Sequence, residues 1–182
     1  MLSEVIPALL KHELLDRAPW PSSSWTPTKE LKVYYNEAEA ALGNGLESYL
    51  AAAAPTLYFK ADAGKTYTII CVDPDAPSRE DSHASPINHW TLSGLRKDNS
   101  EEFEDDEEAV TTLEKALVAY AGPSLKKTGH RYVFFLYENK NGPLLDIEKQ
   151  TTIKEGGGIE ARFNWDFNKF AKENGLELVG AK

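Results

Sequence analysis

Two short polar runs hold the residues of this chain that could do chemistry. The first reads Asp-Pro-Asp-Ala-Pro at residues 73–77, and the second reads Gly-His-Arg-Tyr at residues 129–132. The two prolines stiffen the first run and remove two backbone donors, so few local amides can satisfy its carboxylates, Asp73 and Asp75. A histidine is a suitable partner, because a carboxylate bonded to one ring nitrogen fixes the tautomer and leaves the other nitrogen directed outward. The second run supplies one in His130.

Strand alternation predicts which side chains of the second run act together. Each polar run lies at one end of an apolar, strand-like stretch, so folding can bring both to one sheet edge. In a strand, His130 and Tyr132 share one face and Arg131 takes the other. We therefore expect Arg131 to pair with a carboxylate rather than touch a ligand. His89 stands beside a second strand pattern and is a further candidate. Together these residues predict a small polar pocket.

Each of these residues also has a structural interpretation. The proline-aspartate run is equally typical of a rigid surface turn, and either histidine can simply hydrogen-bond at a strand end. Two aspartates and two histidines could also hold a divalent metal or share acid–base work. Against an enzyme, the chain has no Gly-x-Ser-x-Gly motif and no closely spaced histidine pair, and Cys71 falls within an apolar strand. We therefore expect no catalytic residues, no metal and no cofactor.

Composition limits the partners and the compartment. The 182 residues fit one domain spanning 1–182, and 20 basic against 29 acidic side chains give a net charge of −9. That charge repels phosphate backbones at long range, so we expect no nucleic-acid partner. No segment approaches the roughly 18 apolar residues that cross a membrane, which leaves at most peripheral membrane contact. A single cysteine and an N-terminus without a basic stretch before a long apolar run predict an unprocessed cytoplasmic protein.

The elements that position these residues are mostly strands. Apolar and β-branched runs predict strands over residues 31–35, 56–59, 67–72, 89–94, 131–138 and 176–179. Helical spacing of apolar residues predicts helices over residues 2–15, 109–120 and 161–174, with a helical turn within 47–54. Glycine-containing segments predict turns at 43–45, 141–143 and 156–158. Residues 101–108 form an acidic block that we expect to be exposed, and residues 77–88 form a long polar connection. Two tryptophans in the proline-rich residues 18–27 are expected to cover a sheet.

The order of motifs resembles the phosphatidylethanolamine-binding protein family. The motifs are Asp-Pro-Asp-Ala-Pro-Ser-Arg at 73–79, His-Trp at 89–90, Tyr-x-Gly-Pro at 120–123, Gly-His-Arg-Tyr-Val-Phe at 129–134 and Phe-Ala at 170–171. The closing residues 170–179 look most like the fungal branch that contains carboxypeptidase Y inhibitors. The chain departs from the family pattern at residues 124–128, where a shorter segment replaces a proline pair and a glycine-rich stretch.

The resemblance implies a fold and a set of ligand-binding residues. The fold would be mainly β, with a large central antiparallel sheet, a smaller second sheet and peripheral α-helices. The aspartates would orient and charge the histidines, and Gly122 and Pro123 would give the backbone rim of a shallow anion pocket. The implied ligand-binding residues are Asp73, Asp75, Pro77, His89, Gly122, Pro123, His130 and Tyr132.

Two functions follow from the resemblance. The first is a non-enzymatic binding protein for a phosphate-containing small molecule or a phospholipid head group, which regulates a protease or kinase pathway. The alternative is an inhibitor of a serine carboxypeptidase of the carboxypeptidase Y type, acting through the N-terminal segment and the protein surface. The second function rests on shared fold alone.

Overall fold

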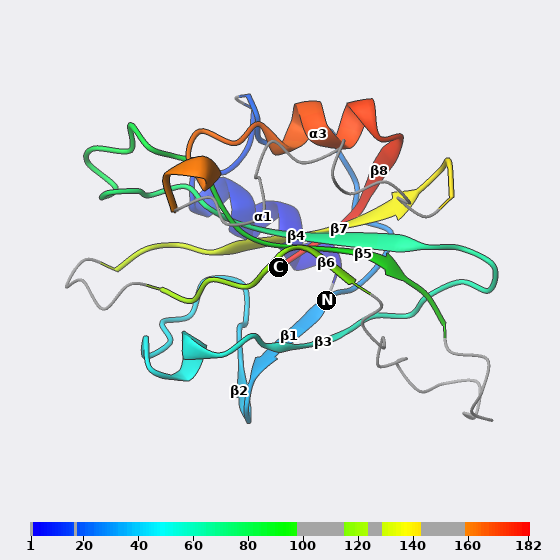
Figure 1. Cartoon of the computed structure of the whole chain (residues 1–182), viewed down its shortest axis with the longest axis horizontal. Helices are drawn as coiled ribbons and strands as arrows, with labels where there is room; N and C mark the ends of the chain where they lie inside the picture. Colours follow the sequence, from blue (N-terminus) through cyan, green and yellow to red (C-terminus); the bar gives the residue numbers. More distant parts are fainter. Residues whose placement is uncertain (1, 17, 98–114, 124–128, 143–158) are drawn as a thin grey trace.

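The fold is built on a five-stranded antiparallel sheet. The computed structural model describes residues 2–16, 18–97, 115–123, 129–142 and 159–182. The strand order in the large sheet is β6-β5-β4-β7-β8, so β4 lies at its centre (Figure 1). Its strands are β4 (Tyr67–Asp73), β5 (Ile87–Leu95), β6 (Lys115–Val118), β7 (Val133–Asn139) and β8 (Leu176–Ala181).

A smaller antiparallel sheet lies against one face of the large one. Its order is β2-β1-β3, from strands β1 (Lys32–Tyr35), β2 (Ala38–Glu39) and β3 (Thr56–Tyr58). The helical elements are short: the 3₁₀-helices are η1 (Leu2–Glu4), η2 (Leu50–Ala52) and η3 (Ile159–Arg162), and the α-helices are α1 (Val5–Lys11) and α3 (Phe167–Glu173). No helix within these described residues is long and apolar enough to cross a membrane.

The central strand is buried on both faces, which explains its continuous apolar sequence. Ile70 and Val72 belong to one buried cluster, with α1 and α3, whereas Ile69 and Cys71 belong to the other, with the small sheet. All seven residues of β4 are buried. Because successive side chains of a strand point to opposite faces, a strand covered on both sides has no polar face.

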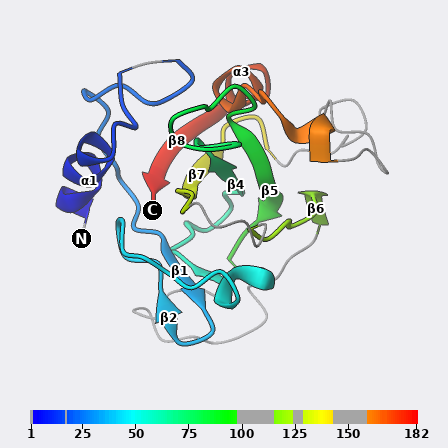
Figure 2. The ribbon, with the colours of Figure 1, turned by 90° about the vertical axis from the view of Figure 1, so that its left-hand side faces the viewer.

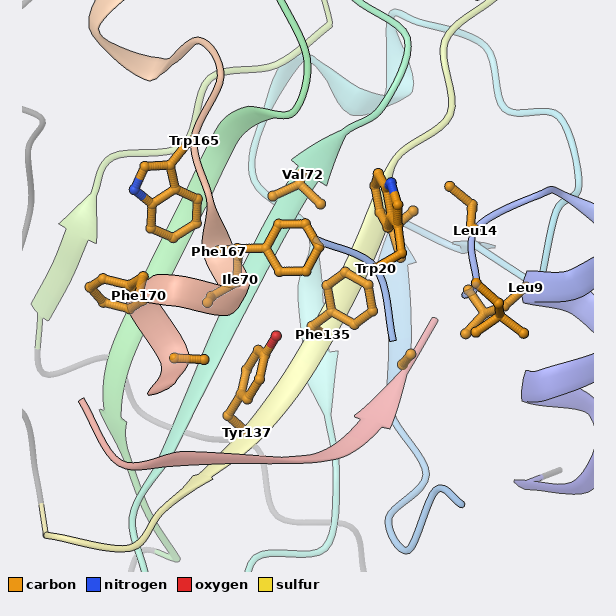
Figure 3. Close-up of a cluster of buried hydrophobic side chains, with 14 of the residues drawn as sticks. Leu9, Leu14, Trp20, Ile70, Val72, Phe135, Tyr137, Trp165, Phe167 and Phe170 are labelled. Atoms are coloured by element: carbon orange, nitrogen blue, oxygen red, sulfur yellow. The ribbon is translucent and has the colours of Figure 1, made fainter. Parts of the chain in front are cut away.

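Aromatic rings fill the cluster between the large sheet and α3 (Figure 3). Phe135 of β7 stacks on Phe167 of α3 with ring centroids 5.1 Å apart, and Trp20 meets Phe167 edge-on at 5.3 Å. Trp20 is buried, so the prediction that the proline-rich segment covers a sheet is confirmed for it. Trp25 is partly buried against the same cluster and donates its ring N–H to the Leu178 carbonyl.

The six strands expected from the sequence are present, but all three expected helices differ from the observed elements. The helix expected over residues 109–120 is wrong at its C-terminal end, because residues 115–118 form strand β6. They pair with the free edge of β5, with Ala116 opposite Leu92 and Val118 opposite Thr91. Backbone pairing at a sheet edge overrides the local apolar spacing there. Residues 109–114 lie outside the described part of the chain, as do the acidic block at 101–108 and the glycine bend at 156–158.

The C-terminal helix is shorter than expected. In place of one helix over residues 161–174, the chain forms η3, a turn with Asn164 at φ +50°, and then α3. Asp166 begins α3, where its side chain accepts the amide of Lys169 at 2.9 Å. A side-chain acceptor at this position satisfies one of the unpaired N–H groups of the first turn. The N-terminal helix is also shorter than residues 2–15, since α1 ends at Lys11.

Candidate anion-binding site

Strand register brings the two polar runs together. The pairing of β4 with β7 ends at Val72 and Val133, so Asp73 follows directly on one strand and Tyr132 precedes the other. On the opposite side of β4, Cys71 faces Trp90 and Val72 faces Asn88, which leaves His89 as the extra residue of a β-bulge. A bulge redirects a side chain relative to the regular strand.

Asp73 is the centre of the site. Its Oδ2 lies 2.7 Å from Nδ1 of His130 and 3.7 Å from Nε2 of His89. Its Oδ1 accepts the amide of Asp75 at 2.7 Å. The Asp73 side chain is 2% exposed and that of His130 is 15% exposed. Residues 57 positions apart therefore meet as the sequence predicted, with the imidazole held by the carboxylate.

The charge of this carboxylate is stabilised by its surroundings. Burial by itself raises the pKa of Asp73, but the neighbouring rings of His89 and His130 and the amide of Asp75 outweigh it and lower that pKa from its ordinary value of 3.8. Asp73 is thus an anion across the neutral range.

His89 has one satisfied ring nitrogen and one unsatisfied ring nitrogen. Its Nδ1 lies 2.5 Å from the carbonyl oxygen of Ala121, and because a carbonyl can only accept, Nδ1 carries a proton. Its Nε2 is buried and has no hydrogen-bond partner within the described part of the chain. The ring of Tyr132 packs edge-on against the His89 ring with centroids 5.0 Å apart.

Tyr132 is a neutral phenol in this site. Burial raises the pKa of its hydroxyl, and the negative charge of Asp73 raises it further. The hydroxyl therefore keeps its proton over the physiological range and can donate a hydrogen bond to an anion.

The structure corrects the expected role of Asp75. This residue was expected to orient a histidine, but its carboxylate instead binds Arg131, accepting the backbone amide at 2.9 Å, Nε at 2.8 Å and Nη2 at 2.5 Å. The prediction that Arg131 pairs with a carboxylate is confirmed. Sequence spacing could not say which aspartate takes which partner, since that depends on how the proline-rich turn directs each side chain.

Arg131 also fixes the end of the N-terminal helix. Its Nη1 donates to the carbonyl of His12, the residue that follows α1. At the next residue, Glu13 forms an ion pair with Arg79 at 3.0 Å. The proline-aspartate run and the N-terminal segment are therefore joined through two arginines.

The expected rim residues occupy different positions. Pro123 lines a cavity beside His130, whereas Pro77 is exposed and is not among the described residues that line this cavity. Gly122 packs against η2, where an added Cβ would stand 2.7 Å from the Ala51 carbonyl oxygen. Glycine is required there by close approach of the backbone rather than by contact with a ligand.

The cavity opens beside the histidine site and has a volume of about 540 Å³. Figure 2 shows α1 and the small sheet on either side of the end of β8, and the cavity is lined by residues of α1 and β1 together with Lys182, which follows β8. Its polar wall includes His12, Asn44, Glu47, Ser48, His130, Arg131, Tyr132 and Lys182, and its apolar wall includes Leu9, Leu14, Leu42 and Leu46. No group of three or more His, Cys, Asp or Glu side chains within the described ranges is arranged to hold a metal ion.

Comparison with known proteins identifies the class of protein that this fold and site define. The family model described as phosphatidylethanolamine-binding protein matches residues 22–181, and the chain belongs to that family. The carboxypeptidase Y inhibitor of Saccharomyces cerevisiae is 30% identical over an alignment 192 positions long, and the alignment covers 87% of this chain and 84% of the relative.

Solved structures confirm the fold. The crystal structure of carboxypeptidase Y inhibitor complexed with its cognate proteinase is similar with a TM-score of 0.75 and 27% identity, covering 100% of this chain and 93% of the other. A phosphatidylethanolamine-binding protein from Plasmodium vivax gives a TM-score of 0.71 at 22% identity, covering 97% and 94% of the two chains. The mainly-β architecture with two antiparallel sheets, and the similarity to the fungal inhibitor branch, agree with the sequence analysis.

Proposed function

We propose that this protein is a non-enzymatic binding protein whose histidine–aspartate site takes a phosphate-type anion. The observation that carries the proposal is the buried, unsatisfied Nε2 of His89 beside the Asp73–His130 pair. A buried polar atom without a partner is costly, and a ligand atom at this position would satisfy it. A protonated imidazole donates from both ring nitrogens, so it can bond a carboxylate and a phosphate oxygen at once.

The ligand we propose is a phosphate ester, such as a phospholipid head group, rather than a free anion alone. The neighbouring cavity of about 540 Å³ falls within the range of roughly 300–1,000 Å³ typical of pockets for small organic ligands. Its apolar wall, with Leu9 and Leu46, suits an apolar or glycerol-like substituent. The net charge of −9 opposes binding of anions at long range, so affinity must come from the local donors.

Isothermal titration tests this proposal with two probes, inorganic phosphate and glycerophosphoethanolamine. We expect both to bind the wild-type protein and His130→Ala to weaken binding by about tenfold or more, since one charge-assisted hydrogen bond contributes about 1.5–3 kcal/mol. Tighter binding of the glycerol ester than of phosphate would support use of the cavity.

His83 provides a matched control, because its side chain is 70% exposed and pairs with the nearby Asp81 at 2.8 Å. His83→Ala should bind like the wild type. Unchanged affinity in His130→Ala, or no binding of either probe to the wild-type protein, would refute the proposed site.

We also propose a second function, inhibition of a serine carboxypeptidase. It is supported by the 30% identity to carboxypeptidase Y inhibitor over most of both chains. The proposed contact is the N-terminal segment, where Leu10 of α1 is 62% exposed while its neighbour Leu9 is buried. An exposed leucine on a helix that is packed against the core can contact a protein partner while the buried residues stay in place.

An inhibition assay against carboxypeptidase Y tests the second function. Deletion of residues 1–16 would also remove Leu9, Leu14 and Leu15 from the core, so a point substitution is the cleaner variant. Leu10→Glu should lose inhibition, whereas Ile159→Glu, at another exposed apolar residue, should keep it. Absence of inhibition by the wild-type protein would remove this function, and inhibition undiminished by Leu10→Glu would remove the N-terminal route.

Two broader expectations belong to the same proposal. We propose a cytoplasmic location, in keeping with a single buried cysteine, and a regulatory role in a protease or kinase pathway. A fluorescent fusion followed by microscopy would test the first, and accumulation in a secretory compartment would contradict it.

A further inference from the structure

Arg162 holds three backbone carbonyls near the candidate site. This residue ends η3, and its Nη1 donates to the carbonyl oxygen of Ala119 at 2.8 Å and to those of Asn88 and His89 at 3.3 Å each. None of the sequence motifs includes it. Every residue has a backbone carbonyl, so an arginine that binds carbonyls has no partner residue type that the sequence could reveal. The role of Arg162 could therefore not be predicted from the sequence.

The three carbonyls belong to the two segments that orient His89. Ala121 donates its amide to the carbonyl of His89 at 2.9 Å and accepts Nδ1 of the same residue at 2.5 Å. Residues 119–121 thus lie beside the start of β5, with Ala121 held opposite His89 by these two hydrogen bonds. The guanidinium of Arg162 joins these segments from the outside, next to the bond that sets the His89 tautomer.

The same guanidinium brings a positive charge to this junction. Within the described residues it contacts carbonyl oxygens and no carboxylate, and burial lowers the pKa of the guanidinium from its ordinary value. An arginine nevertheless stays charged in proteins. Among the described residues no carboxylate pairs with Arg162, in contrast to Arg131, which pairs with Asp75.

We propose that Arg162 is a positioning residue of the anion site, which holds the Ala121 carbonyl on β5 and so keeps His89 with Nδ1 protonated and Nε2 beside Asp73. This inference rests on the proposed anion binding and names a residue outside the resemblance that acts on that site. It predicts that loss of the guanidinium changes the state of the His89 ring as well as affinity.

Substitution of Arg162 should leave the fold intact. The segment around it is docked by other contacts, since Phe163 packs against Ala76, Ala84 and Ile87. The amides of Asn164 and Trp165 donate to the carbonyls of Ala84 at 3.0 Å and Pro86 at 2.9 Å. Residues 119–121 are also held from the other side, where the Tyr120 hydroxyl donates to the Ala51 carbonyl at 2.7 Å.

The experiment compares Arg162→Gln and Arg162→Lys with the wild-type protein by two measurements. Phosphate titration should show about tenfold weaker binding for Arg162→Gln, and partial recovery for Arg162→Lys because an ammonium group can also donate to several carbonyls. Nitrogen-15 NMR of the histidine rings, without phosphate, should show a slowly exchanging Nδ1 proton on His89 in the wild type. That signal should be lost in Arg162→Gln and retained in Arg162→Lys.

Arg79→Gln is the matched control, since it removes the same charge from an exposed arginine paired with Glu13. It should leave both measurements unchanged. Equal loss of affinity in Arg79→Gln and Arg162→Gln would assign the effect to net charge and overturn the inference. An unchanged His89 ring signal in Arg162→Gln would also overturn it. Failure of the wild type to bind phosphate would remove the proposed function, while the ring signal would still decide the role of Arg162.

Discussion

Substitution of Asp75 by asparagine separates the structural part of the site from its binding part. Asp73 and Asp75 have the same expected role from sequence, but in the structure Asp73 binds His130 and Asp75 binds Arg131. We therefore expect Asp75→Asn to lower the free energy of unfolding and leave phosphate affinity unchanged. Asp73→Asn should instead weaken phosphate binding, because the His130 ring loses the charge that holds it.

The size of the effect follows from the contacts that are lost. Asp75 is 1% exposed and receives the amide, Nε and Nη2 of Arg131, whose side chain is 18% exposed. Removing one partner of a buried ion pair costs about 3–5 kcal/mol. Because Arg131 keeps some contact with water and asparagine keeps one acceptor oxygen, we expect about 3 kcal/mol. For a chain of this length that corresponds to a decrease in Tm of about 6–12 °C.

Urea denaturation and thermal melting measure the stability change, and titration with inorganic phosphate measures binding on the same preparations. Asp73→Asn is the reference variant, since it makes the same chemical change two residues away. Our reasoning would be refuted if Asp75→Asn lost phosphate affinity as strongly as Asp73→Asn while its unfolding free energy stayed at the wild-type value. That result would return Asp75 to the ligand-binding role expected from the sequence.

Three further predictions concern stability. The folded-state pKa of Asp73 lies below 3.8, so the ionised carboxylate adds to the free energy of unfolding above that pH. This contribution is lost as the pH falls through the folded-state pKa. Urea midpoints measured between about pH 5 and pH 2 should therefore fall less steeply in Asp73→Asn than in the wild type. Gly122→Ala places a Cβ 2.7 Å from the Ala51 carbonyl and should cost about 1–3 kcal/mol by urea denaturation, so an unchanged midpoint would exclude the close approach. Phe167→Ala removes a ring that is 1% exposed and should cost about 3–5 kcal/mol in the same assay, and a loss below 1 kcal/mol would contradict its place in the core.

The strands could be predicted well because their information is local. Within the expected strands at 67–72 and 131–138, residues 69–72 and 133–137 are apolar on both faces, which is the pattern of strands buried inside a protein. The helix expected over residues 109–120 failed because residues 115–118 pair with the edge of β5, and such pairing has no local signal. The C-terminal helix was overextended for a similar reason, since Asp166 and the turn at Asn164 separate two short elements.

The sequence by itself determined which residue types carry charge and hydrogen bonds, and that Asp73, His130 and Tyr132 end or precede strands. It could do so because alternation and proline stiffness act over a few neighbouring residues. Only the tertiary structure decided the pairing of Asp75 with Arg131 and the orientation of His89 by a β-bulge. Those outcomes depend on strand register and on the backbone carbonyls of distant segments. The types of individual residues do not predict either of these.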